Sequence, residues 1–117
     1  MRKFFRGFAF AFNGIKYTFK TQLNFRVHCF VAIVIAALCF YLELNKTEWL
    51  WIVAATTMVL MAELANTAIE TLVDLVSPEY NLKAGLVKDI AAALVLLAAL
   101  MAFTIGILIL LPKIIHA

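Results

Sequence analysis

An all-α integral membrane protein is the fold class that this sequence predicts, on three observations. Hydrophobic residues make up 66% of the 117 residues and charged residues only 15%, whereas soluble domains are about half apolar and about a quarter charged. The mean hydropathy is +1.02. Three apolar segments are each long enough to cross a bilayer as a helix. A chain of this length has room for one domain, residues 1–117, with short connections.

The N-terminal segment, residues 1–27, combines phenylalanines with basic residues. Its apolar side chains recur at spacings of three and four, and most of its basic and amide side chains fall elsewhere on the helical wheel. This pattern is typical of an amphipathic helix that lies in the headgroup region of a membrane. Packing on the protein's own polar end is a compatible alternative. We find no signal-peptide pattern and expect the segment in the mature protein.

Polar residues or prolines end each of the three apolar segments. The first ends at the sequence ELNKTE. The second ends at Ser77 and Pro78, because proline cannot continue a helix. The third ends at Pro112 and Lys113. The expected spanning helices are residues 28–45, 48–76 and 88–112.

The distribution of basic residues predicts the orientation in the membrane. Six of the ten Lys and Arg residues precede the first span, and two more, Lys83 and Lys88, lie between the second and the third. The positive-inside rule places these regions in the cytoplasm. We therefore expect a cytoplasmic N-terminus, with Trp49 and Trp51 at the outer interface.

Ionisable and amide residues gather in the second span, in the sequence MAELANTAIETLVDL. On a helix that advances about 100° per residue they share a sector of about 100°. Burying a carboxylate in a membrane costs at least about 2.5 kcal/mol unless it is paired, hydrated or bound to a cation. For Asp74, a solvated helix end is as good an explanation as a functional role. Glu63 is better explained by a functional role, because residues 49–62 before it carry no charge. The stripe consists of Glu63, Asn66, Thr67, Glu70 and Asp74.

Two chemistries could use such an acidic stripe. Carboxylates hold Mg²⁺ together with water and substrate phosphates, and an intramembrane glutamate can carry protons in a transporter. Lys88 and Asp89 open the third span, and a lysine at a helix N-terminus favours phosphate. Acids and a lysine near one membrane face indicate phosphoryl transfer, although lysines at helix ends commonly snorkel. The chain has no Gly-rich phosphate loop, CxxC, HExxH or GxSxG motif.

The sequence AELANTAIETLVDLVSPEYNLKAGLVKDIAAALVLL, residues 62–97, resembles the signature of the prokaryotic diacylglycerol kinase and undecaprenol kinase family. That signature is close to E-x-x-N-[ST]-A-I-E-x-x-x-D, then E-Y, then K-D-x-[AG]-[AS]-A, and the resemblance extends upstream through residues 12–28. It implies a homotrimer of three-span protomers in the bacterial cytoplasmic membrane. It also implies transfer of the γ-phosphoryl group of MgATP to a lipid hydroxyl, of diacylglycerol or undecaprenol. Mg²⁺ is then the cofactor, and no nucleic-acid partner is expected.

The resemblance also implies roles for individual residues. Glu63 matches the general base that takes the proton from the lipid hydroxyl, and Asn66 matches a polar partner near it. Glu70 matches a metal-binding glutamate. The residues that match the nucleotide site are Asp74, Glu79, Lys88, which is expected on the phosphates, and Asp89.

Gln22 departs from the family pattern, because relatives usually have there a glutamate that is a second metal ligand. Glutamine still offers a carbonyl oxygen but removes a negative charge. Weaker metal binding, greater reliance on Glu70 and the ATP phosphates, and reduced activity remain open.

Two other functions remain as alternatives to an active lipid kinase. One rival is a small proton-coupled transporter built on Glu63, which would not need Lys88. The other is a catalytically impaired family member, which only Gln22 suggests. Arg26 and His28 are interpreted mainly as interface anchors, and no lipid-binding residue is assigned.

Overall fold

The structure is a computed structural model that describes residues 1–117. It consists of four helices and the short connections between them, without a strand. Three of the helices are long and apolar enough to cross a membrane, which confirms the predicted all-α membrane fold with three spanning helices. The helices are α1 (Arg2–Thr21), α2 (Leu23–Tyr41), α3 (Lys46–Val76) and α4 (Leu82–Ile115).

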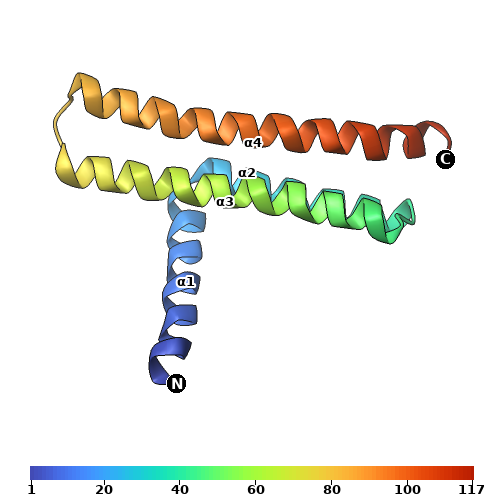
Figure 1. The fold of residues 1–117 in the computed structure, drawn as a ribbon, viewed down its shortest axis with the longest axis horizontal. Helices are drawn as coiled ribbons and strands as arrows, with labels where there is room; N and C mark the ends of the chain where they lie inside the picture. Colours follow the sequence, from blue (N-terminus) through green and yellow to red (C-terminus); the bar gives the residue numbers. More distant parts are fainter.

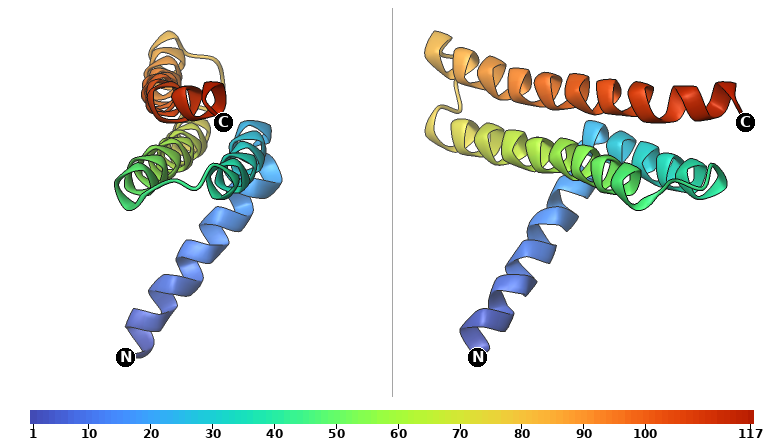
Figure 2. Two further views of the ribbon diagram at one scale, coloured as in Figure 1. Left: turned by 90° about the vertical axis from the view of Figure 1, so that its right-hand side faces the viewer. Right: turned by 45° about the vertical axis from the view of Figure 1, so that its right-hand side comes forward.

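The three long helices form the body of the molecule, and α1 projects from its side (Figure 1). Helices α3 and α4 form a long antiparallel hairpin, and α2 runs along one side of it. Figure 2 shows that α1 leaves the bundle partway along α3, so that the connected end of the α3–α4 hairpin extends beyond it. The connected end of the α3–α4 hairpin therefore lies at a different height along the bundle from α1.

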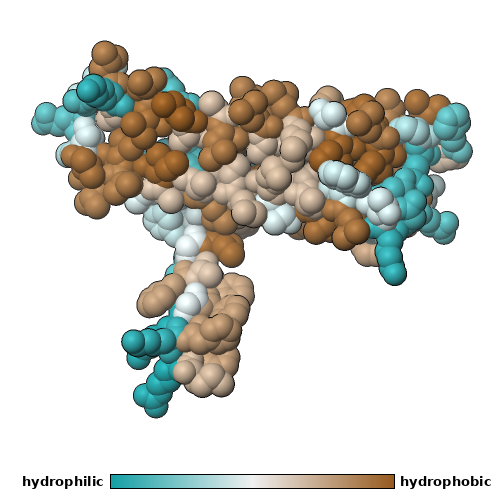
Figure 3. Space-filling model, in the orientation of Figure 1, coloured by the Kyte–Doolittle hydropathy of each residue, from teal (hydrophilic) through white to brown (hydrophobic).

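The surface of the bundle is apolar over most of its length. Only 14 of the 117 residues are buried, and most large hydrophobic side chains are exposed. Figure 3 shows hydrophilic residues gathered at the two ends of the bundle and along one side of α1. Such a surface requires an apolar surrounding, because water would have to solvate it at a large free-energy cost. The protein is a membrane protein.

A sharp corner separates α1 from α2. The surface helix expected over residues 1–27 ends at Thr21, because Gln22 has an extended backbone with φ −115° and ψ 111°. The guanidinium of Arg26 reaches back from α2 and donates to carbonyl oxygens in the last turn of α1, which have no partner within their own helix. Arg26, interpreted from the sequence as an interface anchor, thus caps a helix. The acceptors are the carbonyl oxygens of Phe19, at 2.8 Å, and Lys20, at 3.0 Å.

A capping box starts α3. The side chain of Asn45 accepts from the Glu48 backbone N–H at 2.9 Å, and the Glu48 carboxylate accepts from the Asn45 N–H at 3.0 Å. The same carboxylate lies 3.2 Å from the Lys113 ammonium at the far end of α4. Residues 42–45, which we expected within the first span, form the turn before this cap. The ion pair therefore joins the start of α3 to the end of α4.

An asparagine cap also sets the start of α4. The Asn81 side chain accepts from the backbone N–H groups of Lys83 and Ala84 at 2.9 and 3.3 Å, so the helix begins at Leu82. It begins six residues earlier than the third span expected from residue 88. The expectation that Lys88 lies at a helix N-terminus is therefore wrong, and the helix dipole does not account for a phosphate site there.

Candidate active site

The polar stripe of α3 passes from buried to exposed along the helix. Glu63 is 2% exposed, Asn66 9% and Thr67 4%, whereas Glu70 is half-buried and Asp74 is exposed. The Thr67 hydroxyl donates to the backbone carbonyl of Glu63 at 2.9 Å, so its hydrogen-bond donor has a partner within α3. The three carboxylates of the stripe are therefore in a buried, a half-buried and an exposed environment along one helix.

The Glu63 carboxylate contacts α2 through His28. The distance from Nε2 of His28 to Oε1 of Glu63 is 3.3 Å, and the side chains are 28% and 3% exposed. Oε1 is buried and makes no hydrogen bond of good geometry. A buried carboxylate without a full set of donors is costly, so this oxygen has an unused acceptor position.

Asn66 has a second unused acceptor. Its amide nitrogen donates to Oε1 of Glu70 at 3.2 Å, which leaves the amide oxygen pointing away from that carboxylate. This oxygen is buried and has no hydrogen-bond partner. Two acceptors of neighbouring helical turns, on Glu63 and Asn66, thus lack donors. Nearly all buried polar atoms in proteins have partners, so each exception calls for an explanation such as a catalytic role or a bound ion.

Lys88 and Asp74 form an ion pair between α4 and α3. The ammonium of Lys88 donates to Oδ1 of Asp74 at 2.6 Å, and the two side chains are 41% and 66% exposed. Asp74 lies one turn nearer the α3–α4 connection than the half-buried Glu70, and Lys88 lies in the second turn of α4. Two residues that the family resemblance assigns to the nucleotide site are therefore in contact, although they are 14 positions apart in sequence.

The remaining candidate residues are less closely grouped. Glu79 lies exposed in the α3–α4 connection, Asp89 lies exposed on α4, and Gln22 lies partly buried at the α1–α2 corner. No group of three or more His, Cys, Asp and Glu side chains is close enough to share a metal ion. Glu70 is the half-buried carboxylate nearest the Asn66 amide. A metal held here would need ligands from a substrate as well.

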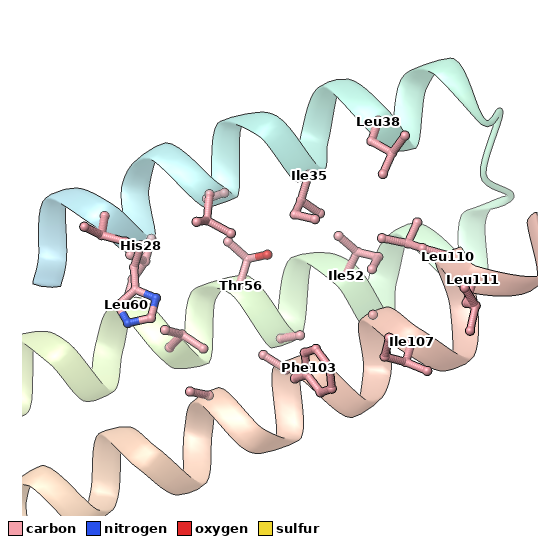
Figure 4. A pocket seen from close by; sticks show the side chains of 18 of the residues that line it. His28, Ile35, Leu38, Ile52, Thr56, Leu60, Phe103, Ile107, Leu110 and Leu111 are labelled. Carbon is pink, nitrogen blue, oxygen red and sulfur yellow. The ribbon is translucent and has the colours of Figure 1, made fainter. Parts of the chain in front are cut away.

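An apolar groove of about 490 Å³ runs between α2, α3 and α4. Sixteen of its 19 lining residues are hydrophobic, and the other three are His28, Thr56 and Gly106. Figure 4 shows His28 and Leu60 at one end and Leu111 toward the other, with side chains from all three helices facing the space. Because His28 also contacts Glu63, the groove ends next to the buried carboxylate.

The sequence profile of the family described as prokaryotic diacylglycerol kinase matches residues 9–110, nearly the whole chain. This chain belongs to the prokaryotic diacylglycerol kinase family. It is 44% identical over 108 residues to a diacylglycerol kinase of Synechocystis, a match that covers 90% of this chain and 61% of that protein. It is 37% identical to the undecaprenol kinase of Bacillus subtilis, over 97% of this chain and 92% of that protein.

A third relative, a diacylglycerol kinase of Haemophilus influenzae, is 34% identical over 76% of this chain and 75% of that protein. The family resemblance stated from the signature residues is therefore confirmed. The relatives include kinases of two different lipid alcohols, so the chain is a member of a family of lipid kinases.

In this member of the kinase family, His28 is the site residue that sequence reasoning missed. It was interpreted as an interface anchor at the start of a span, whereas its ring faces the most buried carboxylate of the chain. One signal was present in the sequence. His28 is the only basic side chain between Arg26 and Lys46, and a buried glutamate needs a donor or a cation at similar depth.

Proposed function

We propose that this chain transfers the γ-phosphoryl group of MgATP to the hydroxyl of a membrane lipid, either diacylglycerol or undecaprenol. The observation that carries the proposal is the Glu63 carboxylate, 2% exposed, with an unpartnered oxygen at the end of an apolar groove. A lipid chain in the groove brings its hydroxyl next to this buried carboxylate. Family membership favours this function over a proton-coupled transporter.

Glu63 acts as general base in the proposed reaction. Its carboxylate accepts the proton of the lipid hydroxyl while the hydroxyl oxygen attacks the γ-phosphorus. A new P–O bond to the lipid forms, the bond between the γ-phosphorus and the β,γ-bridging oxygen breaks, and ADP leaves with that electron pair. The proton remains on Glu63 until it passes to water. The amide of Asn66, oriented by Glu70, offers its free oxygen to the same region.

The nucleotide is proposed to bind at the projecting end of the α3–α4 hairpin. The Lys88 ammonium neutralises charge on the transferring phosphates, and Asp74 holds that ammonium in place when no nucleotide is bound. Glu79 and Asp89 complete the nucleotide site as the family pattern assigns it. This end lies beyond the level at which α1 leaves the bundle, and we expect a water-soluble nucleotide to reach it there.

The residues present suit a Mg²⁺ ion that arrives with ATP. Mg²⁺ in kinase sites typically has one or two carboxylate ligands, and phosphates and water fill the other positions. Glu70 supplies one carboxylate, and Gln22 is the proposed neutral second ligand. When bound, the ion offsets the negative charge of the phosphates. A cage made only of protein carboxylates is not required for this role.

Replacing Gln22 by glutamate is expected to lower the Mg²⁺ concentration at half-maximal rate. A second carboxylate adds a full charge to a site with one carboxylate, and a difference of about 1.4 kcal/mol corresponds to about tenfold. We expect a decrease of about three- to tenfold for Gln22→Glu, measured by Mg²⁺ titration at saturating ATP. Gln22→Ala is the matched control and should raise the requirement. An unchanged titration in both variants would remove Gln22 from the metal site.

Filling the groove should impair binding of the lipid. Gly106 lines the groove, and a Cβ added there has no atom within 4 Å, so a larger side chain begins without a clash. Gly106→Leu is expected to raise the lipid KM several-fold while kcat and the KM for ATP stay within about twofold, because the chemistry lies at the opposite end. Gly106→Ala should have a smaller effect. Thr104→Leu, at an exposed position of α4 outside the groove, is the control.

The direct test is phosphorylation of the two lipids side by side in detergent micelles with radiolabelled ATP. We expect Mg²⁺-dependent label in one of the two lipids and none when Mg²⁺ is chelated. Absence of label in both, from protein with the expected helical circular dichroism, would contradict the proposed activity.

Assembly and topology are also proposed from the family pattern. We expect a homotrimer in the bacterial cytoplasmic membrane with the N-terminus in the cytoplasm. The basic residues of α1 and of the α3–α4 connection support this orientation through the positive-inside rule. Light scattering of the detergent-solubilised protein measures the oligomeric state. Accessibility of a cysteine introduced at Lys3 to an impermeant thiol reagent in intact cells measures the orientation, with Cys29 and Cys39 replaced by serine.

A further inference from the structure

The inference concerns His28, which the proposed reaction does not use. Its ring comes from α2, the only helix that places a titratable group against Glu63 from another element. The other charged group near Glu63 is Glu70, two turns further along α3 itself. Helix α4 contributes small apolar residues to this region, with Ala98 packed against Ala62. Whatever orients the Glu63 carboxylate from outside its own helix must therefore act through His28.

His28 lies between the Glu63 carboxylate and the apolar groove, a position that a simple membrane-interface anchor would not need. Its Nε2 lies 3.3 Å from Oε1 of Glu63, and the same ring lines the end of the apolar groove. The ring is 28% exposed whereas the carboxylate is 3% exposed. A hydroxyl that arrives along the groove therefore passes the imidazole before it reaches the carboxylate. His28 is the only titratable side chain along the wall of the groove.

Neither ring nitrogen of His28 is engaged elsewhere, because no hydrogen bond in the structure involves this side chain. An imidazole always offers at least one N–H donor. At 3.3 Å the Nε2 to Oε1 contact needs only a small change in ring orientation to become a hydrogen bond. A donor at that point would hold the carboxylate toward the groove rather than toward Glu70.

We propose that His28 is a positioning residue for Glu63: its Nε2–H is donated to Oε1 of Glu63 and aims the carboxylate at a hydroxyl arriving from the groove. This inference rests on the proposed function, in which Glu63 is the base. His28 makes no bond to phosphate and does not bind the nucleotide. Its effect is on the rate of the chemical step and not on the affinity for either substrate.

The test compares His28→Leu with His28→Gln, since the side-chain amide nitrogen of glutamine can occupy the place of Nε2 and donate, whereas leucine cannot. His28→Leu is expected to lower kcat about tenfold or more, but by no more than the factor of about 10²–10⁴ that the general base itself contributes. Its KM values for lipid and ATP should stay within about threefold. His28→Gln should recover most of the lost kcat.

A double-mutant cycle with Glu63→Gln separates positioning from a structural role. If His28 acts through Glu63, adding His28→Leu to Glu63→Gln should cause no further loss, since the group being positioned is already absent. A purely structural role predicts that the losses multiply and that melting temperature and activity fall together in both His28 variants. Wild-type kcat in His28→Leu, a change confined to the lipid KM, or multiplicative losses would each overturn the inference.

Failure of the proposed function gives a different result. In that case the wild-type protein labels no lipid, or Glu63→Gln keeps wild-type activity, before any His28 variant is compared. Loss of activity in Glu63→Gln together with an inert His28→Leu would retain the proposed function and reject the positioning role.

Discussion

Glu63→Gln should lower kcat for lipid phosphorylation by about 10²–10⁴-fold, the range that general-base catalysis contributes. The substitution keeps the shape of the side chain at a position that is 2% exposed. It removes the only carboxylate at the end of the groove. Glutamine cannot replace that carboxylate as the base, because an amide oxygen is too weakly basic to accept the hydroxyl proton. The KM for lipid should change little, since the apolar groove supplies that binding. Initial rates in micelles with radiolabelled ATP measure both constants.

Stability distinguishes a catalytic Glu63 from a structural one. Removing the charge from a buried carboxylate lifts its desolvation penalty, so the melting temperature of Glu63→Gln should equal or exceed that of the wild type. Glu43→Gln, in the exposed turn at the opposite end of the bundle, is the matched control and should keep full activity. A Glu63→Gln variant that melts at the wild-type temperature and phosphorylates lipid at the wild-type rate would exclude Glu63 as the base.

Lys88→Met should raise the KM for ATP and lower kcat, together reducing kcat/KM for ATP by about 10²-fold or more. The methionine keeps the apolar stem and removes the charge that offsets the developing negative charge on the phosphates. The Lys88 ammonium is exposed and paired only with Asp74, so a nucleotide phosphate can compete for it. Steady-state kinetics at varied ATP measure the effect, and the lipid KM should stay unchanged.

Two comparisons make the Lys88 prediction specific. Lys83→Met removes an equal charge from an exposed position near the start of the same helix, and should change kcat/KM for ATP by less than about threefold. Exposed ion pairs contribute little to stability, so neither Lys88→Met nor Asp74→Asn should lower the melting temperature markedly. If Lys88 only snorkels, Lys88→Met and Lys83→Met will have equal kinetics.

Hydropathy and periodicity alone predicted most of the fold. The lengths of the apolar segments predict three spanning helices, and the spacing of Glu63, Asn66 and Glu70 places them on one helix face. These properties are local, since a helix satisfies its own backbone hydrogen bonds and its side-chain period is set by its geometry. The family signature, residues 62–97, is likewise local in sequence, since it lies in one continuous stretch that covers the end of α3 and the start of α4.

Helix ends were predicted less well than helix centres. The apolar pattern continues from residue 1 toward the first span, so it does not reveal that Gln22 breaks the helix and that Arg26 caps the α1 end. The Asn81 cap moves the start of α4 to Leu82. Caps depend on one side chain meeting particular backbone groups, whereas hydropathy averages over a whole window.

The sequence by itself determined the class of the protein, the number of spanning helices and the acidic stripe of α3. Only the tertiary structure decided which partners the stripe has: His28 from α2 beside Glu63, Lys88 from α4 on Asp74, and a groove shared by three helices. The physical reason is that such contacts depend on how each helix is rotated and shifted against its neighbours. Packing of many weak apolar contacts sets those rotations, and no single residue in the sequence specifies them.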